Sequence, residues 1–352
     1  MTKPVAIDLF CGAGGLSLGL KSVGFRIAAG VELDRLAART FKLNNPRAIS
    51  ISGDIRTVSP WALKKDIGGR IDLLAACPPC QGFTSLTSQF RRDDPRNDLV
   101  SEVLRFAEKL RPRAVMFENV PRFATSEKGR TRFLNVIEAL TSMGYRVKWS
   151  ILDAADFGSA QFRKRLVVFA TKAEIQLPTK SHSRVGADGE QKWRTVRDAI
   201  GHTKKATPFA PGSLTGVRAK SEWHVTRRLS QLNQRRLEVA MPGGARWDLP
   251  DELRPPCHVG SNVGFKNVYC KMTWSEPSPT ITGGCTSPSK GRFGHPKHAR
   301  TISVREAALL QDFPDDYLID TDGRMDRVCE MVGNAFPSRL AAAAAKQVID
   351  IL

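Results

Sequence analysis

Cys80 is the side chain best placed for covalent chemistry, because it directly follows the sequence IDLLAACPP at residues 71–79. The apolar run at 71–76 predicts a buried strand, which must stop at Pro78 and Pro79 because a proline has no N–H to donate. Cys80 then lies just beyond the carboxyl end of a strand, where open α/β sheets bind their ligands. A free thiol, with a pKa of about 8.5, is partly ionised near neutrality and strongly nucleophilic. The stretch also suits a buried structural cysteine, so both interpretations stay open here.

Charged side chains stand at the ends of two further predicted strands. Glu118 follows the apolar residues 114–117, while Arg163 and Arg165 precede the apolar residues 166–170. These positions predict a carboxylate and two guanidinium groups near the rim of the sheet. Ordinary surface charge beside a strand is the alternative interpretation of the arginines.

A glycine turn follows the first predicted strand. Residues 5–10 are rich in strand formers, residues 11–15 read CGAGG, and a helical pattern of leucines comes next. Such a turn lets the backbone approach a nucleotide-like ligand closely, and an acid about 20 residues later, here Glu32, suits the hydroxyls of a ribose. Asp54 follows another short strand. The turn alone is weak evidence, and it would suit a dinucleotide cofactor equally well.

Strands alternate with helices from residue 5 to residue 170, which predicts an α/β fold with a doubly wound, mostly parallel sheet. The polar segment 85–98 predicts a mobile loop. Beyond residue 177 glycine, proline and basic residues dominate, and clear helical patterns return only at 303–311 and 338–351. The sequence therefore predicts a second, smaller and irregular domain.

The charge of the chain indicates a polyanionic partner. The formal net charge of the 352 residues is +19, and residues 180–300 hold 21 Lys plus Arg against 9 Asp plus Glu. Nucleic acid is the most common partner of such a chain, an anionic membrane surface is a lesser alternative, and a solubilising basic surface is a third. No apolar run reaches 18 residues, the start lacks a secretory signal, and seven cysteines without framework spacing fit a reducing compartment. We expect a soluble, cytoplasmic protein.

These segments together resemble the cytosine-C5 DNA methyltransferase family, in the family's order and over nearly the whole chain. The matching segments are DLFCGAGG at 8–15, Glu32, GDI at 53–55, PPCQGF at 78–83, ENV at 118–120, QFRKR at 161–165, REAALLQDFPDDY at 305–317 and GNA at 333–335. The chain departs from the family at GNAFPSRL, where GNAVPP is commoner, and at Ala160, where proline is frequent. Neither departure removes a reacting group.

The resemblance implies a catalytic set of four residues. Cys80 would add to C6 of a cytosine and so make C5 nucleophilic, while Glu118 would hold or protonate N3 of the base. One of Arg163 and Arg165 would clamp O2 of the base and orient Glu118, and the other would support it or bind a phosphate. The sequence names no base for the C5 proton, and water is the expected one.

The cofactor implied by the resemblance is S-adenosyl-L-methionine, with S-adenosyl-L-homocysteine as the product. Glu32 would bind the ribose, Asp54 the adenine amino group, and Asn334 would close the pocket. The full set of expected cofactor residues is Phe10, Gly12, Ala13, Gly14, Gly15, Glu32, Leu33, Asp54, Ile55, Pro78, Leu99, Asn334 and Ala335. We expect no metal, because no second pair accompanies the cysteines of CPPC at 77–80 and the later cysteines lack zinc-ligand spacing.

The resemblance also implies two domains around a flipped base. Residues 1–177 and 301–352 would form a Rossmann-like catalytic domain, and residues 178–300 a β-rich target-recognition domain with a hinge. A cytosine must leave the duplex to react, and residues of the 85–98 loop and its approach would contact the DNA; these are Gln81, Thr84, Arg91, Arg92 and Arg96. We expect a monomeric, nucleoid-associated enzyme that binds double-stranded DNA but no membrane, with a cognate restriction endonuclease as a functional partner, or an orphan modification role.

Three other functions compete with this interpretation. The same chemistry on a transfer RNA would require a similar chain. A nicotinamide-dependent oxidoreductase would explain the glycine turn and Glu32, but it leaves PPCQ, ENV and QFRKR without a purpose. A non-catalytic DNA-binding regulator would explain the charge, yet every expected reacting residue is present.

Overall fold

The computed structural model describes residues 3–79, 99–210, 215–218, 220–256, 259 and 266–352. Two compact units divide the chain. Unit 1 comprises Met1–Phe157, Lys164–Ser181 and Phe336–Leu352, and unit 2 comprises Gly158–Arg163 and His182–Ala335. The division predicted from sequence differs mainly at residues 301–335, which the structure groups with unit 2. The segment predicted to be a loop, 85–98, lies outside the described residues.

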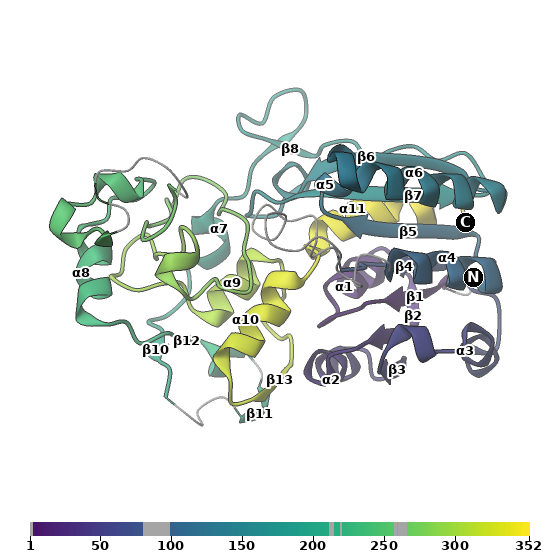
Figure 1. Ribbon diagram of the computed structural model, residues 1–352, viewed down its shortest axis with the longest axis horizontal. Helices are drawn as coiled ribbons and strands as arrows, with labels where there is room; N and C mark the ends of the chain where they lie inside the picture. Colours follow the sequence, from purple (N-terminus) through teal and green to yellow (C-terminus); the bar gives the residue numbers. More distant parts are fainter. Residues whose placement is uncertain (1–2, 80–98, 211–214, 219, 257–258, 260–265) are drawn as a thin grey trace. The chain divides into compact units, whose positions relative to one another are not determined.

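Unit 1 is built on a seven-stranded sheet with the order β3-β2-β1-β4-β5-β7-β6, which confirms the predicted doubly wound, mostly parallel fold (Figure 1). The strands from β1 to β5 are parallel, while β7 runs antiparallel to both β5 and β6. Their bounds are β1 Val5–Leu9, β2 Arg26–Glu32, β3 Ile49–Ser52, β4 Leu73–Ala76, β5 Ala114–Asn119, β6 Arg146–Asp153 and β7 Lys164–Thr171. The chain changes direction across the sheet between β1 and β4, and such a switch point is where α/β sheets bind ligands.

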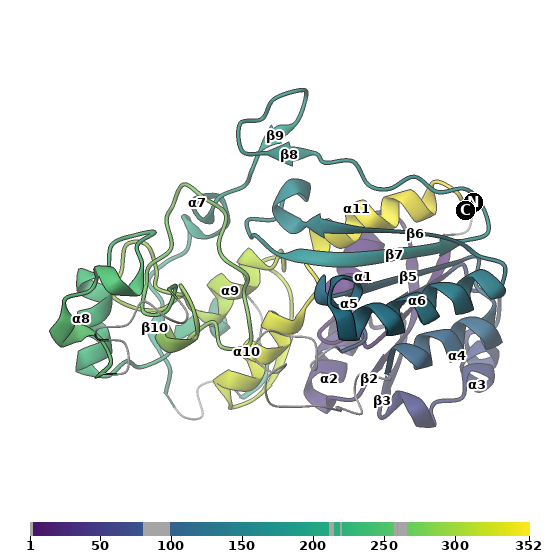
Figure 2. The ribbon, with the colours of Figure 1, turned by 45° about the horizontal axis from the view of Figure 1, so that its top comes forward.

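Helices cover both faces of this sheet, and each face has its own apolar core (Figure 2). Residues of α3, α4 and α6 contribute to the core on one face, and residues of α1, α2 and α11 to the core on the other. The helices of unit 1 are α1 Gly15–Ser22, α2 Arg35–Asn44, α3 Pro60–Ile67, α4 Val100–Leu110, α5 Arg122–Thr125, α6 Glu127–Ser142 and α11 Ser338–Ile349, with 3-10 turns η1 Ile55–Thr57 and η4 Ala154–Phe157. Helix α6 starts earlier than its apolar pattern at 131–143, because Ser126 accepts a hydrogen bond from the N–H of Gly129 and caps it.

The first and last helices of unit 1 touch along their backbones. A Cβ atom at Gly19 of α1 would lie 2.5 Å from the Cβ of Ala341 and 2.6 Å from the carbonyl oxygen of Ser338, both in α11. Only small residues permit such an approach, and the alanines at 341–345 supply them on the other side. The C-terminal helix therefore belongs to the same unit as the glycine turn.

Unit 2 combines helices with short strand pairs. Its elements are β8 His182–Ser183, β9 Gln191–Lys192, α7 Val196–Ile200, β10 Thr207–Pro208, β11 Thr215–Arg218, η5 Lys220–Trp223, β12 Val225–Thr226, α8 Gln231–Val239, η6 Arg246–Asp248, η7 Asp251–Leu253, η9 Pro288–Lys290, α9 Val304–Leu310, β13 Ile319–Asp322 and α10 Met325–Asn334. The sequence predicted α9, but not α8 or α10. Within the described ranges of the chain, no helix is long and apolar enough to cross a membrane.

Candidate active site

The glycine turn and the segment that leads to Cys80 start side by side. Leu9, the last residue of β1, pairs with Ala76, the last residue of β4, and the N–H of Cys77 donates to the carbonyl oxygen of Leu9 over 3.1 Å. Cys80 itself lies outside the described residues. So do all the predicted DNA-contacting residues, Gln81, Thr84, Arg91, Arg92 and Arg96.

The turn after β1 has a sharply bent backbone that a ligand can reach. Phe10, Gly12 and Gly14 all have positive φ angles, of 58°, 52° and 97°. Glycine adopts such angles readily, whereas a phenylalanine does so at a cost in strain, so Phe10 is held there by the structure around it. A Cβ at Gly12 would meet no atom within 4 Å, so the backbone of the turn is accessible to a ligand.

Glu32 ties this turn to the end of β2. Its Oε2 accepts a hydrogen bond from the N–H of Gly12 over 2.9 Å, and its Oε1 accepts one from the N–H of Asp34 over 2.8 Å. Burial raises the pKa of Glu32, although the backbone N–H groups of Gly12 and Leu33 act in the opposite direction. The neighbouring Leu33 has 69% of its side chain exposed, which leaves an apolar surface free beside the carboxylate.

Asp54 and Ile55 follow β3 at the same edge of the sheet. The N–H of Gly53 donates to the carbonyl oxygen of Glu32 over 2.9 Å, which brings the two predicted cofactor segments together. The Asp54 carboxylate caps η1 and pairs with Arg56 at 2.5 Å, and hydrogen bonds from Arg56 lower its pKa. Ile55 is buried, and its carbonyl oxygen accepts a hydrogen bond from Arg105 of α4.

Glu118 and Arg165 form an ion pair at the ends of β5 and β7. The Nε of Arg165 lies 2.5 Å from the Oε1 of Glu118, and the two side chains are 14% and 13% exposed. The antiparallel register, in which Glu118 pairs with Val167, accounts for this meeting. Two residues that lie 47 positions apart in the sequence thus form one hydrogen-bonding surface that is still partly open to solvent.

Arg163 belongs to unit 2. It is 3% exposed, and its guanidinium donates to the carbonyl oxygens of Ile281 over 2.7 Å and of Gly333 over 2.9 Å, all within that unit. Within unit 1, Arg165 is the predicted arginine that pairs with Glu118. Asn334 and Ala335, the predicted closing residues of the cofactor pocket, directly follow Gly333 at the end of α10.

A glutamine pair joins three of the sequence motifs within unit 2. The Nε2 of Gln161 donates to Gln311 over 2.8 Å, while its Oε1 accepts a hydrogen bond from the N–H of Ile281. Gln311 in turn donates to the carbonyl oxygen of Val332 over 2.8 Å. The QFRKR, REAALLQ and GNA segments are thus held together by buried hydrogen bonds, which the sequence analysis did not anticipate.

Asn119 is a second residue that the sequence analysis missed. It is 2% exposed, its amide donates to the carbonyl oxygen of Pro78 over 3.4 Å, and its Oδ1 accepts a hydrogen bond from the N–H of Val120. Asn119 therefore links the strand that carries Glu118 to the segment that carries Cys80. The sequence feature that could have identified Asn119 is its position: a polar amide directly after Glu118, at the end of an apolar strand.

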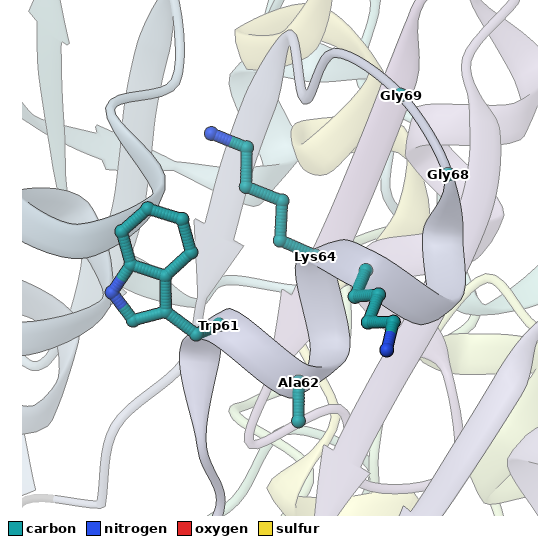
Figure 3. Close-up of a pocket in the computed structure, with 6 residues that line it drawn as sticks. Trp61, Ala62, Lys64, Gly68 and Gly69 are labelled. Atoms are coloured by element: carbon teal, nitrogen blue, oxygen red, sulfur yellow. The ribbon is translucent and has the colours of Figure 1, made fainter.

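Within the described ranges, no group of three His, Cys, Asp or Glu could hold a metal ion. A surface pocket of about 610 Å³ lies on α3 and the two glycines that follow it, and Figure 3 shows its lining residues, Trp61, Ala62, Lys64, Lys65, Gly68 and Gly69. None of the predicted site residues lines it.

Comparison with known proteins identifies the family. The model of the family described as C-5 cytosine-specific DNA methylase matches residues 5–350. The chain belongs to this family. Its members methylate C5 of cytosine in DNA, and the resemblance drawn from the sequence motifs is confirmed.

Relatives over the full length support this assignment. The type II methylase M.HgiDII of Herpetosiphon aurantiacus is 36% identical over 97% of this chain and 94% of its own length. The type II methyltransferase M1.HphI of Haemophilus parahaemolyticus is 34% identical over 98% and 86%. Among solved structures, a DNA modification methyltransferase encoded within an Escherichia coli prophage aligns with a TM-score of 0.74 over 99% of both chains, at 22% identity. That likeness shows that the fold is shared.

Proposed function

We propose that this cytosine-C5 DNA methyltransferase works through Cys80, Glu118 and Arg165 on a cytosine flipped out of duplex DNA. The observation that supports the proposal most strongly is the ion pair between Glu118 and Arg165. Glu118 lies on β5, the strand next to β4, and Arg165 lies on β7, the next strand beyond. Asn119 connects β5 to Pro78, two residues before Cys80. A thiol, a carboxylate and a guanidinium are the groups that addition to a cytosine ring requires.

In this proposal each group has one task on the base. The Cys80 thiolate adds to C6, which places electron density on C5 and N3. Glu118 holds the N3 edge of the ring, and Arg165 donates to O2 while it fixes the position of the Glu118 carboxylate. Expulsion of the thiolate then requires loss of the C5 proton, for which water is the expected acceptor. Arg163 acts at a distance, by holding the segments of unit 2 that carry Ile281 and Gly333.

The donor and acceptor set of unit 1 fits S-adenosylmethionine better than a dinucleotide. The N–H of Gly12, which would face a pyrophosphate, already donates to Glu32, so a phosphate would meet a carboxylate there. Glu32 retains acceptor capacity for ribose hydroxyls, Leu33 offers an apolar surface for the adenine, and Asp54 offers an acceptor for its amino group. The remaining predicted cofactor residues keep their predicted roles as part of this proposal; they are Phe10, Ala13, Gly14, Gly15, Ile55, Pro78 and Leu99 of unit 1, and Asn334 and Ala335 of unit 2. When bound, the cofactor supplies an electrophilic methyl group.

The partner is a specific duplex, and unit 2 supplies its recognition. Exposed basic side chains of this unit, among them Lys204, Lys205 and Lys290, would bind phosphates, which gives affinity that falls with salt. The described relatives are named type II methylases and methyltransferases. We therefore propose a restriction-modification role, with a cognate endonuclease as a functional partner and a monomeric enzyme acting where the chromosome lies.

The decisive experiment is to incubate the protein with S-adenosylmethionine and unmethylated genomic DNA and to sequence the product after bisulfite treatment. The proposal expects protected cytosines at one short recurring sequence, and none with Cys80→Ser. A parallel reaction with transfer RNA tests the competing substrate. Methyl incorporation into the RNA alone would show that RNA, and not DNA, is the substrate. Incorporation into neither DNA nor RNA would overturn the proposed function.

A further inference from the structure

Asp8 is a buried acidic residue that the proposed mechanism does not use. It belongs to β1, where it pairs with Gly30 of β2 and Ala75 of β4, and none of its surface is exposed. Its Oδ2 accepts a hydrogen bond from the hydroxyl of Ser17 in α1 over 2.6 Å. Its Oδ1 is buried and has no hydrogen-bond partner among the described residues. A carboxyl group placed this way needs a reason, because an unpaired buried charge is costly.

In the part of the chain that the structure describes, the groups that act on Asp8 provide no positive charge. Burial raises the pKa of Asp8 to about 7, the nearby Glu32 acts in the same direction, and the hydrogen bond from Ser17 acts against both. Cys11 of the glycine turn is the other titratable group that interacts with Asp8, and Cys77 in turn interacts with Cys11. Two carboxyl groups and two thiols therefore share this corner of unit 1, and among the described residues no Lys or Arg acts on Asp8.

The same corner is the proposed cofactor site. Asp8 precedes the turn at 11–15 by three residues, and Glu32 accepts the hydrogen bond from Gly12 within that turn. A dinucleotide-binding turn presents free N–H groups and a helix N-terminus to an anion. In this chain the corresponding region holds two carboxyl groups, those of Asp8 and Glu32. A site with this charge distribution favours a cationic ligand over a neutral one of the same shape.

We propose that Asp8 determines the charge specificity of the cofactor site: its ionised carboxylate favours the sulfonium cofactor over the uncharged thioether product, and its protonation removes that preference. The inference rests on the proposed function, because it assumes that S-adenosylmethionine binds at the glycine turn. It adds a residue that discriminates substrate from product, and it makes the discrimination depend on pH.

The size of the effect follows from the population of the ionised form. With a midpoint near pH 7, the ionised fraction of Asp8 falls about tenfold from pH 8 to pH 6. An apparent affinity that requires this form falls by the same factor, so the affinity for S-adenosylmethionine should weaken about tenfold over that range. S-adenosylhomocysteine has the same amino, carboxyl and adenosine groups but no positive charge on sulfur. Its affinity therefore reports the titration of all groups other than Asp8, and it should change by less than about threefold over the same pH range.

Isothermal titration calorimetry on the full chain tests this directly. Both ligands are titrated at pH 6, 7 and 8, in buffers of different ionisation enthalpy, so that the protons released on binding are counted as well. We expect S-adenosylmethionine to release a fraction of a proton at pH 7, and S-adenosylhomocysteine to release much less. Equal pH dependence for the two ligands, or no difference in proton release, would overturn the inference while leaving the proposed function intact. Failure of the wild-type chain to bind either ligand would overturn both.

Two variants sharpen the assignment. Asp8→Asn should lower the affinity for S-adenosylmethionine at pH 8 by at least the roughly tenfold that wild type loses by pH 6, and abolish its pH dependence. Ser17→Ala keeps the carboxyl but removes the hydrogen bond that favours its ionised form, so the midpoint should move to higher pH. If Asp8→Asn does not fold, the shift in Ser17→Ala decides, and an unchanged midpoint there contradicts the inference. Asp72→Asn is the matched control, since Asp72 is a buried aspartate at the opposite end of the sheet, bonded to the N–H of Val5.

Discussion

Replacing Arg165 with glutamine should reduce methyl transfer by a calculable amount. The ion pair with Glu118 has an N–O distance of 2.5 Å, and both side chains are about one-seventh exposed. Opposite charges about 4 Å apart near a protein surface attract by about 4 kcal/mol, and the partial exposure reduces this to about 2–3 kcal/mol. If that energy holds Glu118 in its working position, kcat/KM falls about 30- to 150-fold, because 1.36 kcal/mol corresponds to a factor of ten.

The assay is transfer of a tritiated methyl group to duplex DNA, with cofactor affinity measured separately by calorimetry. Arg165→Gln should leave cofactor affinity within about twofold, since the proposed role of Arg165 is to hold the base and Glu118, and it lies outside the glycine turn. Arg146→Gln is the matched control: Arg146 lies on the neighbouring strand β6 and pairs with Glu174, but both side chains are more than half exposed. A kcat/KM for Arg165→Gln within threefold of wild type, with normal folding, would refute the reasoning that the pair positions Glu118.

Three further outcomes are expected. Cys80→Ser should abolish methylation while cofactor and DNA affinities stay within about twofold, and substantial turnover by this variant would sink the nucleophile assignment. Asn119→Asp keeps the acceptor for Val120 but loses the amide donor to Pro78, so kcat should fall about tenfold at constant cofactor affinity; an unchanged kcat would show that this link does not matter for turnover. Glu306, buried in unit 2 beside Arg300, has a pKa lowered to about 2 by hydrogen bonds and charge from Arg300, despite burial that opposes this. Because the pKa of Glu306 is lower in the folded chain, its ionised carboxylate stabilises the fold above about pH 4.5, and this stabilisation is lost as the pH falls towards 2. Glu306→Gln should therefore lower the free energy of unfolding in urea by about 3 kcal/mol at pH 7 and by clearly less at pH 3. An equal loss at both pH values would exclude the ionised carboxylate as the source of the stability.

The sheet of unit 1 could be predicted because its information is local. Most of its strands contain a short apolar run that ends near proline, glycine or a charged residue, and the intervening helices have apolar stripes. The outer strand β6, with the mixed sequence RVKWSILD, is the exception. The parallel order then follows from the alternation of the two element types. The glycine turn and the acid at the end of β2 have a fixed spacing, so the sequence predicts that Gly12 and Glu32 share one site. The structure brings the two into contact through a 2.9 Å hydrogen bond, while their roles in cofactor binding stay a prediction.

Contacts between distant segments could not be predicted in the same way. Arg163 and Arg165 are two residues apart and equivalent as a sequence pattern. β7 begins at Lys164, so Arg165 lies within the sheet, two residues before the partner of Glu118, and its side chain reaches that carboxylate. Arg163 instead donates to Ile281 and Gly333, more than 100 residues away in the sequence. No local pattern encodes that separation.

The missed helices of unit 2 do carry some local signals. Helix α10 has buried apolar residues at helical spacing, among them Val328 and Val332, although it begins without a side-chain cap. Helix α8 is capped by Ser230, but its sequence is polar and only Arg236 and Leu237 are buried, so it shows no apolar stripe. Only α8 therefore has a sequence pattern too weak to predict a helix without its tertiary contacts.

The backbone contact between α1 and α11 has a consequence for biosynthesis. Leu16 and Leu20 of α1 belong to the core that Leu340 and Ala344 of α11 complete, yet the ribosome makes residues 336–352 after every other part of unit 1. Nearly all of unit 2 emerges before that moment and can fold during translation. The apolar face of unit 1 that α11 covers therefore stays open until these residues have been synthesised. A chain that stops short of α11 should expose Leu16 and Leu20, so we expect proteases to cleave it more readily than the full chain.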